Sequence, residues 1–161
     1  MKNPYIAYNC VRLVSNGAVA VVTNGSHTDP IAEKIDLGAP VRDALASVSL
    51  AMDFEKDQYD TPRVSCAIDR RDDSAWLAVV RRDGLEVRSV KLSPGEYAYI
   101  GTYEENKLTP PQAGFTAEDP DQACSFMFKG GVFAERTNPV AAVAAMATAG
   151  GFRLAEKDAP K

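Results

Sequence analysis

Residues 63–92, RVSCAIDRRDDSAWLAVVRRDGLEVRSVKL, decide the fold of this chain. Runs rich in β-branched residues alternate here with RRDDS and with the Asp83-Gly84 pair, and Ser93-Pro94-Gly95 follows. Such runs, separated by turn-forming residues, are typical of antiparallel strands. The pattern therefore predicts a meander of four strands, over residues 63–69, 75–81, 85–92 and 96–103.

The chain before this stretch predicts a hairpin and two helices. Two apolar runs, 5–14 and 18–23, flank an Asn16-Gly17 pair, which is a strong signal for a hairpin turn. Asp29 is a good N-cap and Pro30 a good first residue for a short helix that Gly38 would end. A second helix is expected from Pro40 to about Asp53, because apolar residues recur there at helical spacing.

The chain after the meander predicts further helices. Residues 104–120 read as an irregular connection, and a helix is expected over 121–128, ending at Gly130-Gly131. The alanine-rich stretch 139–148 predicts a buried helix, and residues 155–161 predict a flexible tail. The prediction is therefore a single α+β domain over residues 1–161, with two β groups covered by helices.

Composition narrows the class of protein. Of 161 residues, 45% are hydrophobic and 25% are charged, which suits a globular core. The net charge of −4 argues against nucleic-acid or anionic-membrane partners, which need a basic face. The sequence holds no apolar run of the roughly 20 residues that a membrane span needs, and its start does not read as a signal peptide. Three widely spaced cysteines suit reduced thiols, so a cytoplasmic location is expected.

The loop 24–29 is the densest polar cluster and contains the one histidine, His27. It leads into a helix N-terminus, where free N–H groups and the helix dipole favour an anion. Gly25 would let a ligand approach the backbone, and neighbouring side chains could donate neutral hydrogen bonds. A phosphate-bearing ligand is one interpretation, and a solvated loop in which Asp29 only caps the helix is the other.

A second cluster, Asp53-Phe54-Glu55-Lys56-Asp57, follows a predicted helix end. Carboxylates are unfavourable beside a helix C-terminus. If they are enclosed together, the pKa of at least one should rise, which suits general acid–base chemistry. The alternative is a solvated loop of alternating charges.

Tyr8 and Cys10 lie in the first predicted strand. A strand tyrosine is commonly structural, but a Tyr8 phenol facing a cleft could stabilise a developing oxyanion. Cys10 has no second histidine to activate it, so inert packing is the expectation.

Several chemistries are excluded by their missing motifs. The sequence contains neither a phosphate-binding P-loop nor a GxGxxG dinucleotide fingerprint, and no GxSxG elbow. One histidine and no CxxC pair argue against a zinc site, including that of a zinc deaminase.

Three strings identify a resemblance that runs over essentially the whole chain. NPYIAYNC (3–10), TNGSHTDPI (23–31) and AMDFEKD (51–57), the last followed by TPR (61–63), resemble the archaeal-type IMP cyclohydrolase family. Shorter matches are FKGG at 128–131 and NPV at 138–140.

The resemblance implies a fold and an activity. The fold would be a four-layer αββα sandwich like that of the N-terminal-nucleophile hydrolases, without use of the N-terminal nucleophile. The activity would be dehydrative closure of 5-formamidoimidazole-4-carboxamide ribonucleotide to inosine monophosphate, the last step of de novo purine synthesis. The implied partner is that purine ribonucleotide, within a homo-oligomer, and no metal or organic cofactor is implied.

The same resemblance assigns roles to residues. Glu55 and Tyr8 match the family's catalytic carboxylate and tyrosine. The residues expected to bind substrate are Asn9, Asn24, Gly25, Ser26, His27, Thr28, Asp29, Lys56 and Arg63.

One departure leaves the activity open. Members of the family usually carry a further N-terminal segment that supplies strand structure and a catalytic arginine, whereas this sequence starts just ahead of Asn3. A strand and a cation are therefore expected to be missing, because the chain is truncated or naturally short. The alternatives are a non-catalytic purine-nucleotide-binding paralogue and another amide-ring hydrolase of the same superfamily.

Overall fold

The computed structural model describes residues 7–160. Within them the chain forms two compact units. The first comprises the chain up to Lys91 together with Ala98–Pro110, and the second comprises Leu92–Tyr97 and the chain from Pro111 on. A single domain over residues 1–161 stays a prediction.

The first unit is built on a five-stranded sheet in the order β1-β2-β3-β4-β5. Every neighbouring pair is antiparallel, so the predicted hairpin and the first three strands of the meander are confirmed. The β1–β2 turn uses positive φ angles at Ser15, Asn16 and Gly17, which suits the Asn-Gly signal. The strands are β1 (Val11–Val14), β2 (Val19–Thr23), β3 (Arg63–Asp69), β4 (Ser74–Arg81) and β5 (Gly84–Val90).

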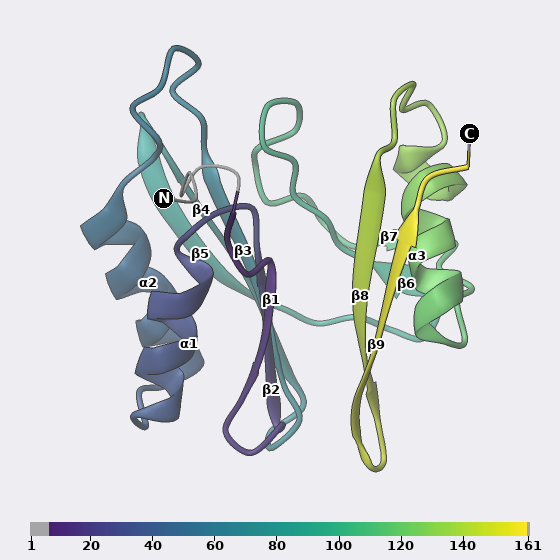
Figure 1. The fold of residues 1–161 in the computed structure, drawn as a ribbon, viewed down its shortest axis with the longest axis horizontal. Helices are drawn as coiled ribbons and strands as arrows, with labels where there is room; N and C mark the ends of the chain where they lie inside the picture. The colour runs from purple at the N-terminus through teal and green to yellow at the C-terminus, as the bar shows by residue number, and fades with distance from the viewer. Residues whose placement is uncertain (1–6, 161) are drawn as a thin grey trace. The chain divides into compact units, whose positions relative to one another are not determined.

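Two helices, α1 (Thr28–Asp36) and α2 (Val41–Met52), cover one face of this sheet (Figure 1). Ile31, Ile35 and Leu45 are buried against strand residues such as Val19 and Val21. The predicted span of the second helix is confirmed. The prediction that Asp29 caps the first helix is wrong. The helix begins at Thr28, two residues before the predicted Pro30, and the Asp29 carboxylate binds other side chains.

The opposite face of the sheet is also apolar. The register of the five strands places eleven apolar residues on it, together with Arg81, Glu86 and Arg88 on β4 and β5, and Ala20, Leu77 and Val79 are buried. A sheet that is apolar on both faces needs cover on both. The eleven are Val11, Leu13, Ala20, Val22, Val64, Cys66, Ile68, Ala75, Leu77, Val79 and Val90.

The second unit contains a hairpin of β8 (Ala141–Thr148) and β9 (Gly151–Asp158), with α3 (Pro120–Lys129) packed against both strands (Figure 1). Asp119 caps α3 by accepting a hydrogen bond from the Gln122 N–H. A short strand pair, β6 (Glu96–Tyr97) with β7 (Gln112–Ala113), and the turn η1 (Gly131–Phe133) complete the unit. The predicted third helix is thus confirmed, and so is a mixed fold with antiparallel sheets.

Three predictions in the C-terminal half are wrong. Within the predicted helix 139–148, residues Ala141–Thr148 form strand β8, because pairing with β9 outweighs the helix propensity of alanine. The same pairing extends β9 to Asp158, so residues 155–158 are not a flexible tail. The fourth run of the meander, 96–103, is a strand only at Glu96–Tyr97, where β7 provides a partner.

Candidate active site

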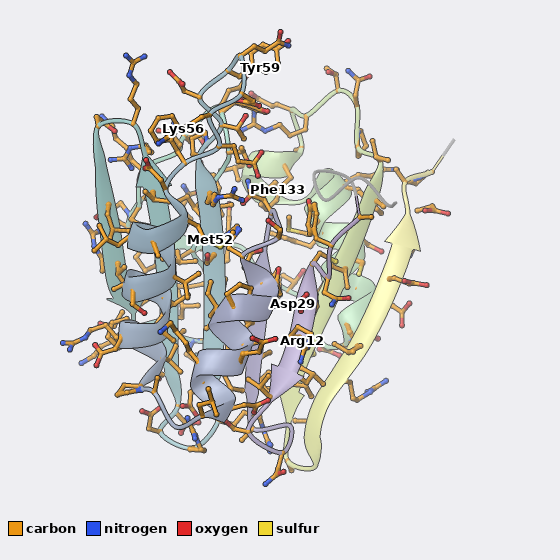
Figure 2. All side chains as sticks on the ribbon, turned by 60° about the vertical axis from the view of Figure 1, so that its left-hand side comes forward. Arg12, Asp29, Met52, Lys56, Tyr59 and Phe133 are labelled. Atoms are coloured by element: carbon orange, nitrogen blue, oxygen red, sulfur yellow. The ribbon has the colours of Figure 1, made fainter. Side chains whose placement is uncertain are left out.

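The candidate site lies where the β2–α1 turn meets the loop between α2 and β3. Thr23 ends β2 and Arg63 begins β3, and the two strands are neighbours in the sheet. The residues between Asp53 and Pro62 leave the end of α2 at the same place. Figure 2 shows Met52, Lys56 and Tyr59 in order along this exit, with Tyr59 at its outer end.

An ion pair between Glu55 and Arg63 is the centre of the site. Arg63 Nη1 lies 2.9 Å from Glu55 Oε1, and the two side chains are only 9% and 19% exposed. Arg63 Nε donates to the main-chain carbonyl of Asp53, also at 2.9 Å. Asp53 has φ 57°, in the left-handed region, and so turns the chain back toward β3. Arg63 therefore fixes one carboxylate oxygen of Glu55, and within the described residues Oε2 accepts no hydrogen bond.

Gly25 packs directly against this pair. A Cβ built on Gly25 would lie 3.0 Å from Arg63 Nη1, 3.1 Å from His27 Nδ1 and 3.2 Å from Glu55 Oε1. Ordinary contacts of a Cβ are longer than this, so three polar side chains converge on space that only glycine leaves open. The requirement is steric, because the backbone at Gly25 does not have a positive φ.

His27 is fully buried next to Gly25. Its Nε2 lies 3.2 Å from the Val64 carbonyl, which makes Nε2 the protonated nitrogen and leaves Nδ1 as a buried acceptor without a partner. Burial lowers the pKa of His27 to about 4, with the Arg63 charge acting in the same direction. His27 is therefore a buried, neutral imidazole that anchors the loop 24–29 to β3 through Val64.

Tyr8 lies close enough to Glu55 for its phenol to sense the carboxylate charge. Its pKa is raised by partial burial first and then by the charges of Cys10 and Glu55, so the hydroxyl stays protonated and can donate. The prediction that Tyr8 and Cys10 belong to the first strand is wrong, because β1 begins only at Val11. Cys10 is exposed rather than packed inside, whereas Cys124 is buried.

Hydrogen bonds within the loop 23–28 occupy most of its polar groups. The Thr23 and Thr28 hydroxyls lie 2.6 Å apart, so one donates to the other, and the second hydroxyl proton is donated to the Gly25 carbonyl, which lies 2.9 Å from Thr23 Oγ1 and 3.0 Å from Thr28 Oγ1. Asn24 bridges to other segments: its amide donates to the Pro62 carbonyl and to Thr102 Oγ1, and its Oδ1 accepts from the Val64 N–H. The expected ligand loop is thus a rigid support, and within the described residues only Ser26 among its side-chain donors makes no hydrogen bond.

Asp29 belongs to a separate cluster with Asn9 and Arg12. Asn9 Nδ2 donates to both carboxylate oxygens, at 3.0 and 3.2 Å, and Arg12 Nη1 lies 2.6 Å from Oδ1. Figure 2 shows Arg12 and Asp29 side by side, from β1 and α1. The hydrogen bond from Asn9 and the Arg12 guanidinium lower the pKa of Asp29. Only one feature of the sequence indicates where Arg12 lies: the register of the β1–β2 hairpin places Arg12 on the face of the sheet that the helices cover.

The other acidic residues of the second cluster each have their own partner. Lys56 Nζ lies 3.3 Å from Asp53 Oδ2, and both side chains are largely exposed. Asp57 accepts from the hydroxyl and the N–H of Thr61, which lower its pKa. The rise expected for at least one of the enclosed carboxylates is therefore not found at Asp57. Thr61 stands in the TPR string, but nothing in the sequence indicates that its hydroxyl binds Asp57.

The site combines a carboxylate that a guanidinium fixes at one oxygen, a second oxygen with no hydrogen bond among the described residues, and a protonated phenol within electrostatic range of that carboxylate. Such a set can accept a proton at one atom and donate one at another. Among residues 7–160, no group of three or more His, Cys, Asp or Glu side chains is arranged to hold a metal ion. None of the helices in this range is long and apolar enough to cross a membrane.

Comparison with known proteins gives consistent matches. A family model described as IMP cyclohydrolase-like protein matches residues 1–151. An IMP cyclohydrolase of Methanosphaera stadtmanae is 46% identical over 144 residues, which is 89% of this chain and 68% of that protein. One from Methanococcus maripaludis is 50% identical over 122 residues, 73% of this chain and 59% of that protein. One from Natronomonas pharaonis is 40% identical over 152 residues, 94% of this chain and 72% of that protein.

Proposed function

The chain belongs to the IMP cyclohydrolase-like family, and we propose that it is an IMP cyclohydrolase. The reaction is the closure of 5-formamidoimidazole-4-carboxamide ribonucleotide to inosine monophosphate with loss of water. The observation that carries the proposal is the Glu55–Arg63 pair at 2.9 Å, whose carboxylate contributes to the raised pKa of Tyr8. The relatives compared above share this name, and the chain spans between 59% and 72% of their lengths.

Two residues account for the proton transfers. The carboxamide nitrogen of the substrate is a weak nucleophile, and Glu55 Oε2 takes its proton as the new C–N bond forms at the formyl carbon. Tyr8 donates its proton to the formyl oxygen as negative charge develops there. The resulting hydroxyl leaves as water with the proton held by Glu55, and the Tyr8 phenolate takes the proton of the formamido nitrogen. Both groups then return to their starting states, and one water is lost.

Arg63 has a positioning role in this scheme. Its guanidinium binds Glu55 Oε1 and the Asp53 carbonyl. These two bonds hold the Glu55 carboxylate in a single orientation, and this fixes the position of Oε2. We retain the remaining substrate-binding assignments as part of the proposal: Asn9, Asn24, Gly25, Ser26, His27, Thr28, Asp29, Lys56 and Arg63. The buried and internally bonded members of this set act by shaping the loop rather than by exposing donors.

The fold proposed for the whole chain is the four-layer αββα sandwich of the N-terminal-nucleophile hydrolases. Two features support it: the five-stranded sheet is mostly apolar on the face away from α1 and α2, and α3 packs against both strands of the β8–β9 hairpin. A homo-oligomer in the cytoplasm completes the proposal. The alternative, a non-catalytic protein that binds purine nucleotides, predicts binding without turnover.

The test is a cyclisation assay followed by ultraviolet absorbance, with Glu55→Gln as the key variant. The substitution keeps the shape of the side chain and removes the base. We expect turnover to fall by at least about 10²-fold while inosine monophosphate still binds. Glu33→Gln, an exposed carboxylate on α1, is the matched control and should retain full activity. Binding without turnover in the unmodified chain would favour the alternative, and full turnover in Glu55→Gln would remove Glu55 from the mechanism.

A further inference from the structure

The first unit contains a pocket that the proposed chemistry does not use. It has a volume of about 560 Å³, which is in the range of small-ligand sites. Three segments form it: the α2–β3 loop, the β4–β5 turn and the returning segment 98–110. The lining residues are Tyr59, Asp60, Pro62, Arg81, Arg82, Asp83, Thr102, Tyr103, Asn106 and Lys107.

The pocket is locally basic in a chain whose net charge is −4. Arg81 is only 16% exposed and is fixed by two bonds, from Nε to Asp83 Oδ1 at 2.9 Å and from Nη1 to the Asn106 carbonyl at 2.7 Å. Within the described residues its Nη2 makes no hydrogen bond, so a rigid donor remains for a ligand. Arg82 pairs with Asp60 at 2.9 Å, but the Arg82 side chain is 78% exposed, and such surface pairs are weak.

Lys107 supplies the third basic charge of the lining, and it contributes to the lowered pKa of Asp83 without pairing with it. In the part of the chain that the structure describes, it forms neither an ion pair nor a hydrogen bond. The lining set thus holds three basic and two acidic side chains. A fixed guanidinium beside a free ammonium group is the arrangement that binds phosphate well.

Two tyrosines give the pocket an aromatic wall. The rings of Tyr59 and Tyr103 meet edge to face with centroids 6.2 Å apart, and each residue is more than 60% exposed. Exposed aromatic rings offer stacking surface for a planar heterocycle. The pocket therefore combines groups suited to a phosphate with groups suited to a ring.

Hydrogen bonds connect this pocket to the loop that carries Glu55. The Tyr103 hydroxyl lies 3.2 Å from Thr61 Oγ1, and the Thr61 carbonyl accepts from the Glu55 N–H at 2.8 Å. Asn24, next to Gly25, donates to both Pro62 and Thr102 on the pocket wall. A ligand held here would thus contact the segments that position Glu55.

We propose that this pocket binds a phosphomonoester that carries a planar ring, with Lys107 and Arg81 on the phosphate and the two tyrosines against the ring. The ligand has two possible sources: the ribonucleotide substrate itself, or a second nucleotide bound apart from it. The inference rests on the proposed function only in the first case.

The test compares Lys107→Met with Lys34→Met, an exposed lysine on α1, in calorimetric titrations with inosine monophosphate, inosine and inorganic phosphate. We expect Lys107→Met to weaken inosine monophosphate binding about tenfold, as the loss of one charge-assisted contact should, and Lys34→Met to leave it unchanged. Inosine should bind at least tenfold more weakly than its monophosphate, and inorganic phosphate should compete with the monophosphate.

Cyclisation kinetics then separate the two sources. If the substrate's own phosphate occupies the pocket, Lys107→Met raises KM about tenfold and leaves kcat nearly unchanged. If a second nucleotide occupies it, KM is unchanged and the chain loses one of two binding equivalents. Unchanged affinity together with unchanged stoichiometry of nucleotide binding in Lys107→Met, or equal affinity for inosine and its monophosphate, would overturn the proposal. The titrations do not need turnover, so an inactive chain would refute the proposed function without deciding the pocket.

Discussion

The space that Gly25 leaves open predicts what a single methyl group would do. In Gly25→Ala the new Cβ would lie 3.0–3.2 Å from atoms of Arg63, His27 and Glu55, where ordinary contacts begin at 3.4 Å. The neighbours must therefore move by a few tenths of an ångström. His27 cannot move easily, because its ring is buried and bonded to Val64, so the displacement falls on the Glu55–Arg63 pair.

The Gly25→Ala substitution is expected to lower both the free energy of unfolding and kcat. Overpacking costs about 1–3 kcal/mol, and the lower chain entropy of alanine in the unfolded state returns about 0.4–1 kcal/mol. The free energy of unfolding should therefore fall by about 1 kcal/mol. Since a misplacement of about 1 Å can cost 10²-fold in rate, a shift of a few tenths should lower kcat by about tenfold.

The assay is urea unfolding together with cyclisation kinetics, on Gly25→Ala and on Gly84→Ala. Gly84 begins β5, and a Cβ there would meet nothing within 4 Å, so this variant should match the unmodified chain in both measurements. If Gly25→Ala kept kcat within about twofold of the unmodified chain while folding normally, the tight convergence on Gly25 would not control the position of Glu55.

Two further predictions concern the residues around Gly25. His27 has a pKa of about 4 in the folded chain, against an ordinary 6.5, so between these pH values the unfolded chain binds more protons. The contribution of the neutral imidazole to the free energy of unfolding should therefore be fully present above pH 6.5. It should fall by about 3 kcal/mol as the pH drops to 4. Urea unfolding of His27→Asn should show a weaker dependence between pH 7.5 and 5, and an identical dependence would contradict the buried neutral imidazole. Asn24→Ala removes a donor and an acceptor that bind Pro62, Thr102 and Val64, and should lower the free energy of unfolding by about 2–3 kcal/mol. Asn24→Asp, which keeps the acceptor for the Val64 N–H, should be intermediate, and equal stability of all three forms would show that Asn24 is free to serve a ligand instead.

Local signals in the sequence were sufficient for most of the first unit. Asn16-Gly17 marks a turn with positive φ at both residues, and β2 to β5 lie within two residues of their predicted bounds, whereas β1 begins at Val11 rather than at residue 5. Alanine gave no such signal in residues 141–148, because it is small enough for either periodicity, and its pairing partner at 151–158 decides the structure.

The candidate site likewise contains one contact that the sequence predicts and others that depend on long-range packing. Glu55 and Arg63 are eight residues apart, and their contact follows from one loop returning to β3. The burial of His27 and the Asn9–Arg12–Asp29 cluster depend on how β1 and α1 pack, which periodicity does not reveal. Asp29 was predicted to cap the helix, but its carboxylate pairs with Arg12, which is 17 residues away in the sequence.

The discontinuous path of the first unit has a consequence for the order of folding during synthesis. All five strands, both helices and the Glu55–Arg63 pair lie before Lys91, whereas the wall of the pocket arrives with Ala98–Pro110 after the chain has left for the second unit. A nascent chain can thus assemble the ion pair from sequence-local contacts while the pocket is still open on one side. The pocket is then closed by a later segment, so slow folding or proteolytic nicking at 98–110 should affect that pocket before it affects the pair.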